Sequence, residues 1–296
     1  MCGFVGIIAT GSEPVGPLPT EVSYYVRSGT QKLELRGPDA GGFYCDNLAC
    51  LGHRRLKVQD LSDNANQPFQ LKVDGPVIVF NGEIYNFREL KNKLILKGYT
   101  FLTTSDTEVL LLLYQIYGVG CLDMLNGIFA FAIWCPVKRT LFLARDRLGI
   151  KPLYTAYCKW GIAFASEKQA LSHLDGIDLS LNDQAIVEYM WFGNTFSNRS
   201  FYKGINSFLP GHYMLSTPST EVIKQYWSPE RLIGSEGYLQ MNEGRERLCE
   251  TLDSCVKRQL VSDLPVGLLL SGGIDSATIA SSAAHQGQNL VAINCE

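Results

Sequence analysis

Cys2 lies directly behind the initiator methionine, so removal of Met1 would leave one residue with both a thiol and a free α-amine. A thiol is a strong nucleophile once a base takes its proton. An α-amine, with a pKa of about 7.7–8.0, can act as that base near neutral pH. Residues 3–9 predict a short buried strand, which would hold Cys2 at the edge of a sheet. The start of the chain therefore predicts an N-terminal nucleophile.

Asn81 and Gly82 form the second group with chemical potential. They follow a β-branched strand predicted over residues 77–80, and the sequence NGEIYN predicts a turn at that point. The side-chain amide of Asn81 and the N–H of Gly82 can both point at one oxygen, as stabilisation of a tetrahedral oxyanion requires. Cys2, Asn81 and Gly82 are therefore the predicted catalytic residues.

Three charged residues complete this group: Arg55 in GHRRLKV, Glu83 in the predicted turn, and Asp106 at a predicted helix start. One guanidinium and two carboxylates suit a zwitterion, because arginine pairs bidentately with a carboxylate and the two acids can hold an ammonium group. A free amino acid whose side-chain amide reaches Cys2 meets this description. The predicted substrate is glutamine.

The sequence SGGIDS, residues 271–276, is the most specific short motif in the chain. It follows an apolar strand predicted over residues 266–270 and precedes a helix that opens at about Ala277. Glycines allow a ligand to approach the backbone, and the helix N-terminus favours an anion. Asp275 can hold Mg²⁺ against phosphates. The motif lacks the GK[ST] of a Walker A loop, and it resembles the pyrophosphate loop of the N-type ATP pyrophosphatases.

Composition excludes several classes of function. The 296 residues suit one large domain or two ordinary ones, and a net charge of −3 without a basic run argues against nucleic acid as a partner. No apolar run approaches the roughly 18 residues that span a bilayer, so no membrane is expected. Nine scattered cysteines predict reduced thiols in a cytoplasmic protein rather than a disulfide framework or a zinc site.

The predicted elements change in character along the chain. Strands and helices are grouped rather than alternating up to about residue 215, which predicts layered antiparallel sheets with outer helices, an α+β fold. Residues 216–240 are predicted to be a linker. Residues 241–296 predict the first β-α-β unit of a parallel α/β nucleotide-binding domain.

Ten stretches in this order resemble glutamine-dependent asparagine synthetases, which begin with a class II glutamine amidotransferase domain. These stretches cover nearly the whole chain: MCGFVGI, RGPDAGG, GHRRLKV, FNGEIYN, SDTEVLL, GIFAFAIW, ARDRLGIKPLY, FASEKQAL, LPGHY and SDLPVGLLLSGGIDSA. The resemblance implies a four-layer αββα sandwich over residues 2–215 with Cys2 as nucleophile after methionine loss.

The resemblance also assigns residues to two sites. The implied glutamine pocket consists of Arg55, Leu56, Lys57, Val58, Gln59, Asn81, Gly82, Glu83 and Asp106. The implied ATP and pyrophosphate site consists of Leu270, Ser271, Gly272, Gly273, Ile274, Asp275, Ser276 and Ile293, with Asp275 as a ligand of Mg²⁺.

The implied reaction has two halves. Cys2 hydrolyses glutamine through a thioester and releases ammonia, and a second domain uses ATP and Mg²⁺ to adenylate aspartate, which ammonia converts to asparagine. The implied partners are glutamine, aspartate and ATP, in an enzyme compatible with a homodimer.

Some positions depart from the family pattern. Leu35 stands where a histidine is common, Lys57 and Gln59 alter the expected pocket rim, and Gln169 stands where lysine is usual, beside Lys168. Family members are about twice as long, which predicts a truncated sequence with an incomplete synthetase half. Two alternatives stay open: an acceptor other than aspartate, such as a sugar acid or a β-lactam precursor, and a non-catalytic truncated subunit. SGGIDS argues against the sugar-phosphate and phosphoribosyl amidotransferases.

Overall fold

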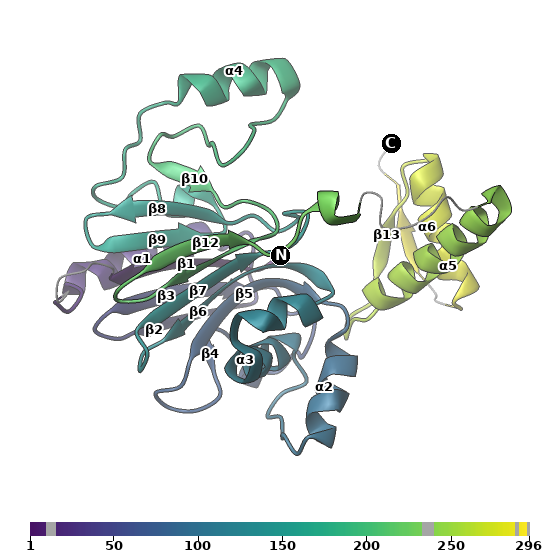
Figure 1. Ribbon diagram of the computed structural model, residues 1–296, viewed down its shortest axis with the longest axis horizontal. Coiled ribbons are helices and arrows are strands. Elements are labelled where there is room, and N and C mark those ends of the chain that lie inside the picture. Colours follow the sequence, from purple (N-terminus) through teal and green to yellow (C-terminus); the bar gives the residue numbers. More distant parts are fainter. Residues whose placement is uncertain (10–15, 233–239, 288–289, 295–296) are drawn as a thin grey trace. The chain divides into compact units, whose positions relative to one another are not determined.

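The computed structural model describes residues 1–9, 16–232, 240–287 and 290–294 of the chain (Figure 1). It divides into two compact units. The first consists of Met1–Lys57 and Ser62–Ser228, and the second of Val58–Leu61 and Pro229–Glu296. Residues 233–239, within the predicted linker, lie outside the described residues.

Two antiparallel sheets form the centre of the first unit. The first sheet has the order β10-β8-β9-β1-β3-β2, and the second has the order β12-β11-β7-β6-β5-β4. The strands of the first sheet are β1 (Gly3–Ala9), β2 (Ala40–Cys45), β3 (Ala49–Arg55), β8 (Tyr154–Cys158), β9 (Gly161–Ala165) and β10 (Ile205–Ser207). Those of the second are β4 (Phe69–Gln70), β5 (Val77–Ile84), β6 (Gly127–Cys135), β7 (Thr140–Arg145), β11 (His212–Ser216) and β12 (Glu221–Gln225).

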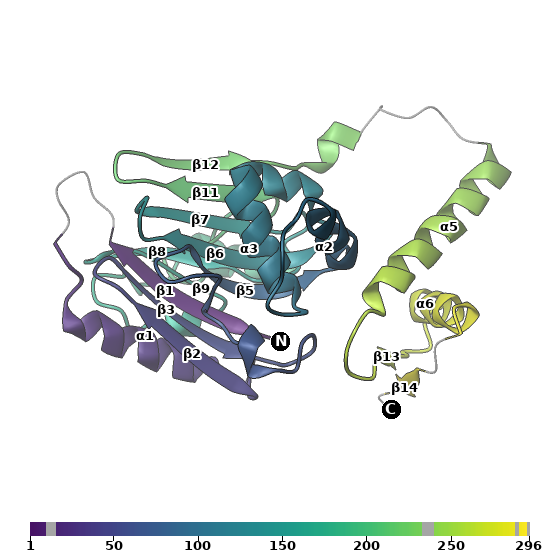
Figure 2. The same ribbon diagram turned by 90° about the horizontal axis from the view of Figure 1, so that it is seen from below.

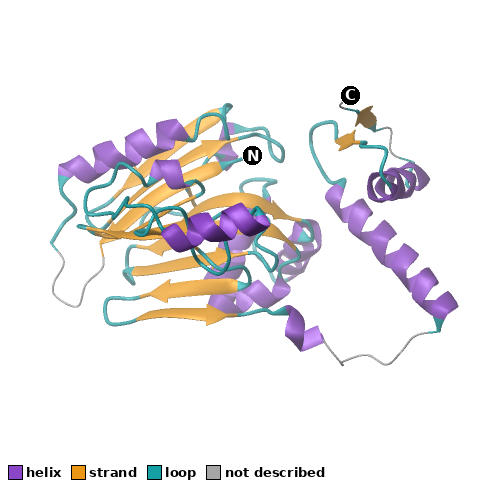
Figure 3. Ribbon diagram, turned by 90° about the horizontal axis from the view of Figure 1, so that it is seen from above, coloured by secondary structure: helices purple, strands orange, loops and turns teal. Residues whose placement is uncertain are grey.

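Helices cover the outer face of each sheet, so the first unit is a four-layer αββα sandwich as predicted (Figures 2 and 3). α1 (Thr20–Lys32) packs on the first sheet through Val22 and Val26. α2 (Phe87–Leu96) and α3 (Asp106–Tyr117) lie over the second sheet, where Tyr114 stacks on the Phe142 ring at 5.0 Å. The remaining helical segments are α4 (Asp183–Phe192), η1 (Asp63–Ala65), η2 (Gly118–Met124) and η3 (Lys168–Ala170).

The inner faces of the two sheets share one apolar core. It includes Phe4 from β1, Leu51 from β3 and Val79 from β5, all of them fully buried. Side chains alternate between the two faces of a strand. This core therefore fixes which residues of β1, β3 and β5 face the space between the sheets.

The predicted turn at Asn81 and Gly82 is wrong. Strand β5 runs through both residues to Ile84, and its partner β6 pairs Asn81 with Ala130 and Gly82 with Phe129. Tertiary pairing overrides the turn propensity of Asn-Gly because the long strand β6 lies alongside. Similarly, β12 lies inside the predicted linker, where it pairs with β11 although all of its residues are exposed.

The sequence predicts an N-cap at Asn86, with Glu89 completing a capping box, and a second N-cap at Ser105 or Asp106. Ser105 caps α3 by accepting a hydrogen bond from Thr107 N, as predicted. Asn86 is the N-cap residue of α2, but its side chain makes no capping bond. Instead it donates to the carbonyl of Met124 and accepts from the N–H of Asn126. The predicted capping box with Glu89 is therefore wrong.

A disulfide joins Cys45 and Cys50, contrary to the prediction that all cysteines are reduced. The two residues are opposite each other on β2 and β3, with their Cα atoms 4.2 Å apart. This pairing depends on the register of a hairpin, which cysteine spacing alone does not show. The other cysteines within the described ranges are free.

One segment, Asp106–Met124, is long and apolar enough to cross a membrane, although the sequence analysis expected none. Half of it is buried inside the fold, and the first two turns of α3 are buried throughout. It is a core helix of the first unit, and its length and composition are weak evidence for a membrane span.

The second unit contains the predicted parallel β-α-β arrangement. Strand β13 (Gly267–Leu269) pairs in parallel with β14 (Val291–Ile293), and α6 (Ile274–His285) connects them. α5 (Met241–Gln259) packs beside α6, and η4 covers Pro229–Leu232. The phosphate-loop motif thus follows a strand and continues into the first turn of a helix.

Candidate active site

Cys2 is held in place because it directly precedes β1, which lies in the interior of its sheet between β9 and β3. The N–H of Leu56 lies 3.4 Å from the Cys2 Sγ, and the Sγ lies 3.7 Å from the Leu56 carbonyl oxygen. Burial raises the pKa of the Cys2 thiol, while the Leu56 contact, the positive N-terminus and Arg55 act to lower it. The thiol is therefore fixed and close enough to Arg55 to feel its charge.

Arg36 fixes the other side of Cys2, a role that the sequence analysis did not assign. Its Nε donates to the carbonyl of Cys2 at 3.0 Å, and its Nη1 pairs with Glu167 at 3.0 Å. Arg36 is the first residue of the motif RGPDAGG, and this motif was the sequence feature that could have indicated its role. The backbone of Cys2 is thus held in place by a charged side chain.

Strand alternation directs Cys2, Arg55 and Asn81 into the same space. Cys2 lies two residues before Phe4, and Asn81 lies two residues after Val79. Arg55 lies four residues after Leu51, which belongs to the same core between the sheets. Because alternate residues share a face, all three side chains are directed toward the space between the sheets, at one end of the apolar core. The structure thus brings together residues separated by up to 79 positions.

Asn81 is almost fully buried, at 1% exposure, yet neither its Nδ2 nor its Oδ1 has a hydrogen-bond partner among the described residues. Buried polar groups are normally paired, and an unpaired one costs about 1–3 kcal/mol. A buried amide with both of its polar atoms unpaired in the described structure indicates a ligand-binding or catalytic position.

Gly82 N–H points away from β6. Its neighbours two residues away on the same strand show this: Phe80 N donates to Gln67 Oε1 at 2.6 Å, and Ile84 N donates to Asp106 Oδ2 at 2.9 Å. In an antiparallel pair the backbone groups of alternate residues point to the same side. The N–H of Gly82 therefore faces the open edge of β5, next to the Asn81 amide.

Two carboxylates lie on this side of the second sheet. Burial raises the pKa of Glu83, and burial raises the pKa of Asp106 to about 7, with the charge of Glu83 acting in the same direction. The half-buried Glu83 thus disfavours ionisation of the buried Asp106, and a bound cation would relieve this repulsion. Arg55, also buried, donates to the Ser62 carbonyl and to Asn66 Oδ1, each at 2.9 Å.

Lys151 is a buried cation near the nucleophile that the sequence analysis did not single out. Its backbone N–H donates to Asp146 at 2.9 Å, and its Nζ lies 3.4 Å from the Met1 sulfur. Burial lowers the pKa of Lys151, while the charges of Glu83 and Cys2 raise it. The ammonium group therefore faces both the N-terminus and the carboxylates.

The predicted pocket border from Leu56 to Gln59 divides between the two units. Leu56 contacts the thiol, whereas Lys57 pairs with Asp63 at 2.8 Å. Val58 and Gln59 belong to the second unit, where the carbonyl of Val58 accepts from Asp263 N and Ser262 Oγ. Their place in the glutamine pocket stays a prediction.

In the second unit the predicted phosphate loop spans the turn after β13 and the first turn of α6, which begins at Ile274 rather than at the predicted Ala277. Gly272 has a φ of +75°, a conformation that favours glycine, and a Cβ added there would meet no atom within 4 Å. Ser271 and Ser276 share a hydrogen bond at 3.1 Å, and Leu270 N donates to Ile293 O at 2.9 Å. The open loop and the exposed N-terminus of α6, which begins at Ile274, fit a phosphate group.

Mg²⁺ needs few protein ligands when it is bound together with phosphates, often one or two carboxylates. Asp275 in the first turn of α6 supplies one such carboxylate. Within the described ranges, no cluster of three or more His, Cys, Asp or Glu residues could hold a metal by itself. The residues present therefore fit Mg²⁺ only as a companion of the phosphates.

Comparison with protein families gives two matches. Residues 1–227 match the family described as glutamine amidotransferase domain, and residues 247–295 match the family described as asparagine synthase. Among solved structures, glutamine phosphoribosylpyrophosphate amidotransferase from Bacillus subtilis aligns with a TM-score of 0.53 at 18% identity. That alignment covers 99% of this chain and 65% of the other, and it supports the fold alone.

Curated relatives include two asparagine synthetases (glutamine-hydrolyzing) of Bacillus subtilis strain 168. This chain is 38% identical to number 2 over 97% of its own length, and 34% identical to number 1 over 96%. It is also 35% identical to amidase chyE of Penicillium rubens over 84% of its length. The chain spans only 39%, 44% and 37% of the lengths of these three relatives, respectively.

Proposed function

We propose that this chain, which belongs to the glutamine amidotransferase domain family and continues into a segment of the asparagine synthase family, hydrolyses glutamine in its first unit. The observation that carries the proposal is the buried, unpaired amide of Asn81 beside the Gly82 N–H, on the face that Cys2 shares. A nucleophile opposite two convergent donors is the arrangement that acyl transfer requires.

The chemistry starts at the Cys2 sulfur after Met1 is removed. The α-amine takes the thiol proton, and the sulfur attacks the carbon of the glutamine side-chain amide. Asn81 Nδ2 and Gly82 N–H then donate to the oxygen that becomes negatively charged. The C–N bond breaks, the nitrogen takes the proton from the α-amine, and ammonia leaves. Water hydrolyses the remaining thioester to glutamate and restores the thiol.

The charged residues orient the substrate. Arg55 binds the α-carboxylate of glutamine, and Glu83 and Asp106 bind its α-ammonium group. This assignment is supported by the raised pKa of Asp106, because a bound cation would stabilise its ionised form. The backbone of Leu56 borders the same pocket.

Two further cationic side chains, Arg36 and Lys151, act on Cys2. Arg36 positions the nucleophile by binding its carbonyl group. Lys151 favours the thiolate and disfavours the protonated α-amine, since a positive charge lowers the pKa of both groups. Both effects increase the fraction of Cys2 that is ready to react.

The second half of the function concerns the segment from residue 241 onward, with the glutaminase domain assigned to residues 2–215. We propose that Ser271 to Ser276 bind the pyrophosphate part of ATP, with Asp275 holding Mg²⁺ and with Leu270 and Ile293 near the adenosine. ATP supplies the activation of a carboxylate, which ammonia converts to an amide. The asparagine synthetases among the relatives favour aspartate as the acceptor. A different carboxylate acceptor is the second candidate, because another relative is named an amidase rather than an asparagine synthetase.

Location and assembly are parts of the same proposal. Glutamine and ATP are cytoplasmic metabolites, so we place the enzyme in the cytoplasm. A homodimer stays a prediction, which light scattering of the purified full chain will test.

Release of glutamate and ammonia from glutamine tests the glutaminase assignment. Wild type and Cys158→Ala, which removes a different half-buried free thiol, should both release glutamate. Cys2→Ala should release none, and intact mass should show that the active protein has lost Met1. Glutamate release that persists in Cys2→Ala would refute the proposal.

A further inference from the structure

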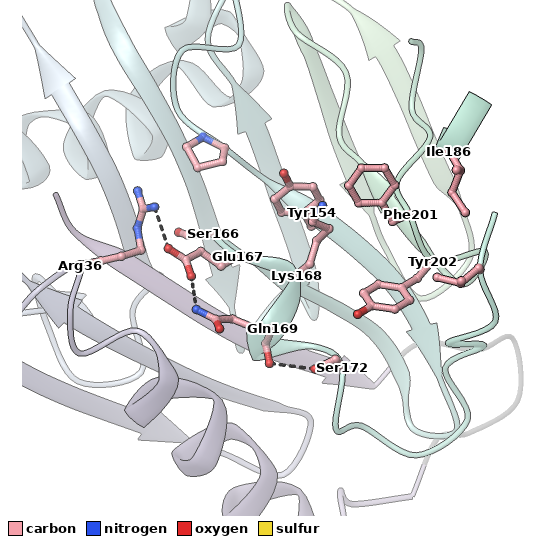
Figure 4. Close-up of a pocket in the computed structure, with 12 residues that line it drawn as sticks. Arg36, Tyr154, Ser166, Glu167, Lys168, Gln169, Ser172, Ile186, Phe201 and Tyr202 are labelled. Atoms are coloured by element: carbon pink, nitrogen blue, oxygen red, sulfur yellow. Dashed lines mark hydrogen bonds and ion pairs between the residues drawn. The ribbon is translucent and has the colours of Figure 1, made fainter. Parts of the chain in front are cut away.

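A cavity of about 610 Å³ lies in the first unit, beside the turn that follows β9 (Figure 4). It is large enough for a small metabolite, since ligand pockets of proteins measure about 300–1,000 Å³. Three aromatic rings contribute to its lining, from Tyr154, Phe201 and Tyr202. No role in glutamine chemistry accounts for these rings.

The charged groups of this cavity leave an excess of positive charge. Glu167 is neutralised by Arg36, and its second oxygen accepts from Gln169, as the dashed lines of Figure 4 show. Lys168 has no carboxylate within ion-pair distance among the described residues. Its Nζ instead lies 4.8 Å from the ring centre of Phe201 and 5.6 Å from that of Tyr154.

Arg36 lines the same cavity on the side of Glu167. Its Nη2 is buried and has no hydrogen-bond partner within the described part of the chain. Its Nε and Nη1 are occupied by Cys2 and Glu167. The uncompensated ammonium of Lys168 is therefore the donor in this cavity that an anionic oxygen would satisfy.

We propose that this cavity binds a small anion that carries a planar ring, with its phosphate or carboxylate on Lys168. The ring stacks against Phe201 and the two tyrosines, because aromatic faces favour offset or edge contacts with other rings. This ligand class differs from glutamine, which has no ring. The binding itself does not depend on the proposed glutaminase function.

Binding at this position should also affect Cys2. Arg36 connects the cavity with the Cys2 carbonyl, so an anion that draws the guanidinium away from Glu167 alters the group that positions the nucleophile. This consequence rests on the proposed function. It makes the cavity a candidate effector site for glutamine hydrolysis.

The test uses 1-naphthyl phosphate and 1-naphthoate as fluorescent probes with the full chain. Saturable binding is expected in wild type. Lys168→Met should weaken it at least tenfold, as the loss of a charge-assisted hydrogen bond predicts. Lys138→Met, at an exposed turn, should bind like wild type. Comparison of the two probes shows whether phosphate or carboxylate is preferred, and 1-naphthol should bind much more weakly than either.

Three results would overturn the proposal. The first is equal affinity of Lys168→Met and wild type for the probes, and the second is equal affinity of wild type for 1-naphthol and for the two anions. The third is displacement of the probe by inorganic pyrophosphate to the same extent in Lys168→Met and in wild type. That result would place the probe at Ser271 to Ser276. If glutaminase activity is absent but the probe still binds through Lys168, only the proposed function fails. If activity is present and no probe binds, only the cavity proposal fails.

Discussion

Replacement of Asn81 by leucine should separate catalysis from stability. The side chain is 1% exposed, and both of its polar atoms lack partners in the described structure. Leucine has a similar size without the unpaired polar atoms, and Val79 on the same face belongs to the apolar core. Removing an unpaired buried polar group should raise the free energy of unfolding by about 1–3 kcal/mol.

The same substitution should nearly abolish glutamine hydrolysis. Loss of one oxyanion donor costs about 10²–10³ in kcat, which corresponds to about 2.7–4 kcal/mol of transition-state stabilisation. KM for glutamine should change little, because Asn81 is proposed to contact the oxygen mainly when it is charged. The variant is therefore expected to be more stable and much less active.

Urea unfolding monitored by tryptophan fluorescence gives the stability of the relevant unit. All four tryptophans, Trp134, Trp160, Trp191 and Trp227, lie in the first unit. Glutamate release gives kcat and KM on the same preparations. Asn86→Leu is the matched control, because Asn86 makes two hydrogen bonds and should lose stability while it keeps activity. An Asn81→Leu protein that is less stable than wild type, or that retains turnover within about threefold, would refute the reasoning.

Three other substitutions test the site. Gly82→Ala should destabilise the first unit by about 1–3 kcal/mol in urea unfolding, because the added Cβ would lie 2.2 Å from the Ile128 carbonyl oxygen. The control Gly120→Ala should not destabilise the unit, because a Cβ there meets no atom within 4 Å. The folded-state pKa of Asp106, about 7, lies above its usual 3.8, so its ionisation destabilises the fold as pH rises from 3.8 to 7. Asp106→Asn should therefore be more stable than wild type at pH 8, and a difference that persists at pH 4 would contradict this origin. Lys151→Met should shift the acidic limb of the pH profile of kcat/KM to higher pH by on the order of one pH unit. Lys151→Arg, which keeps the charge, should leave the profile unchanged. An unchanged profile in Lys151→Met would exclude an electrostatic role.

The sequence by itself determined the elements with strong local signals. Ser105 caps α3, because a serine side chain competes well for a free helical N–H. The apolar run behind Cys2 forms β1 at the residues predicted, and the glycines of the predicted loop connect a strand to a helix, although that helix begins at Ile274 rather than at about Ala277. In each case neighbouring residues alone supply the physical reason.

The tertiary structure decided what depends on distant partners. Asn81 and Gly82 lie in a strand because β6 pairs with them, although Asn-Gly favours a turn in isolation. Register likewise places Cys45 opposite Cys50. The roles of Arg36 and Lys151 appear only when the chain brings them to Cys2. A sequence shows which groups can do chemistry, but the pairing of two sheets decides which of them share one enclosed, poorly solvated space, and electrostatic interactions are strong only there.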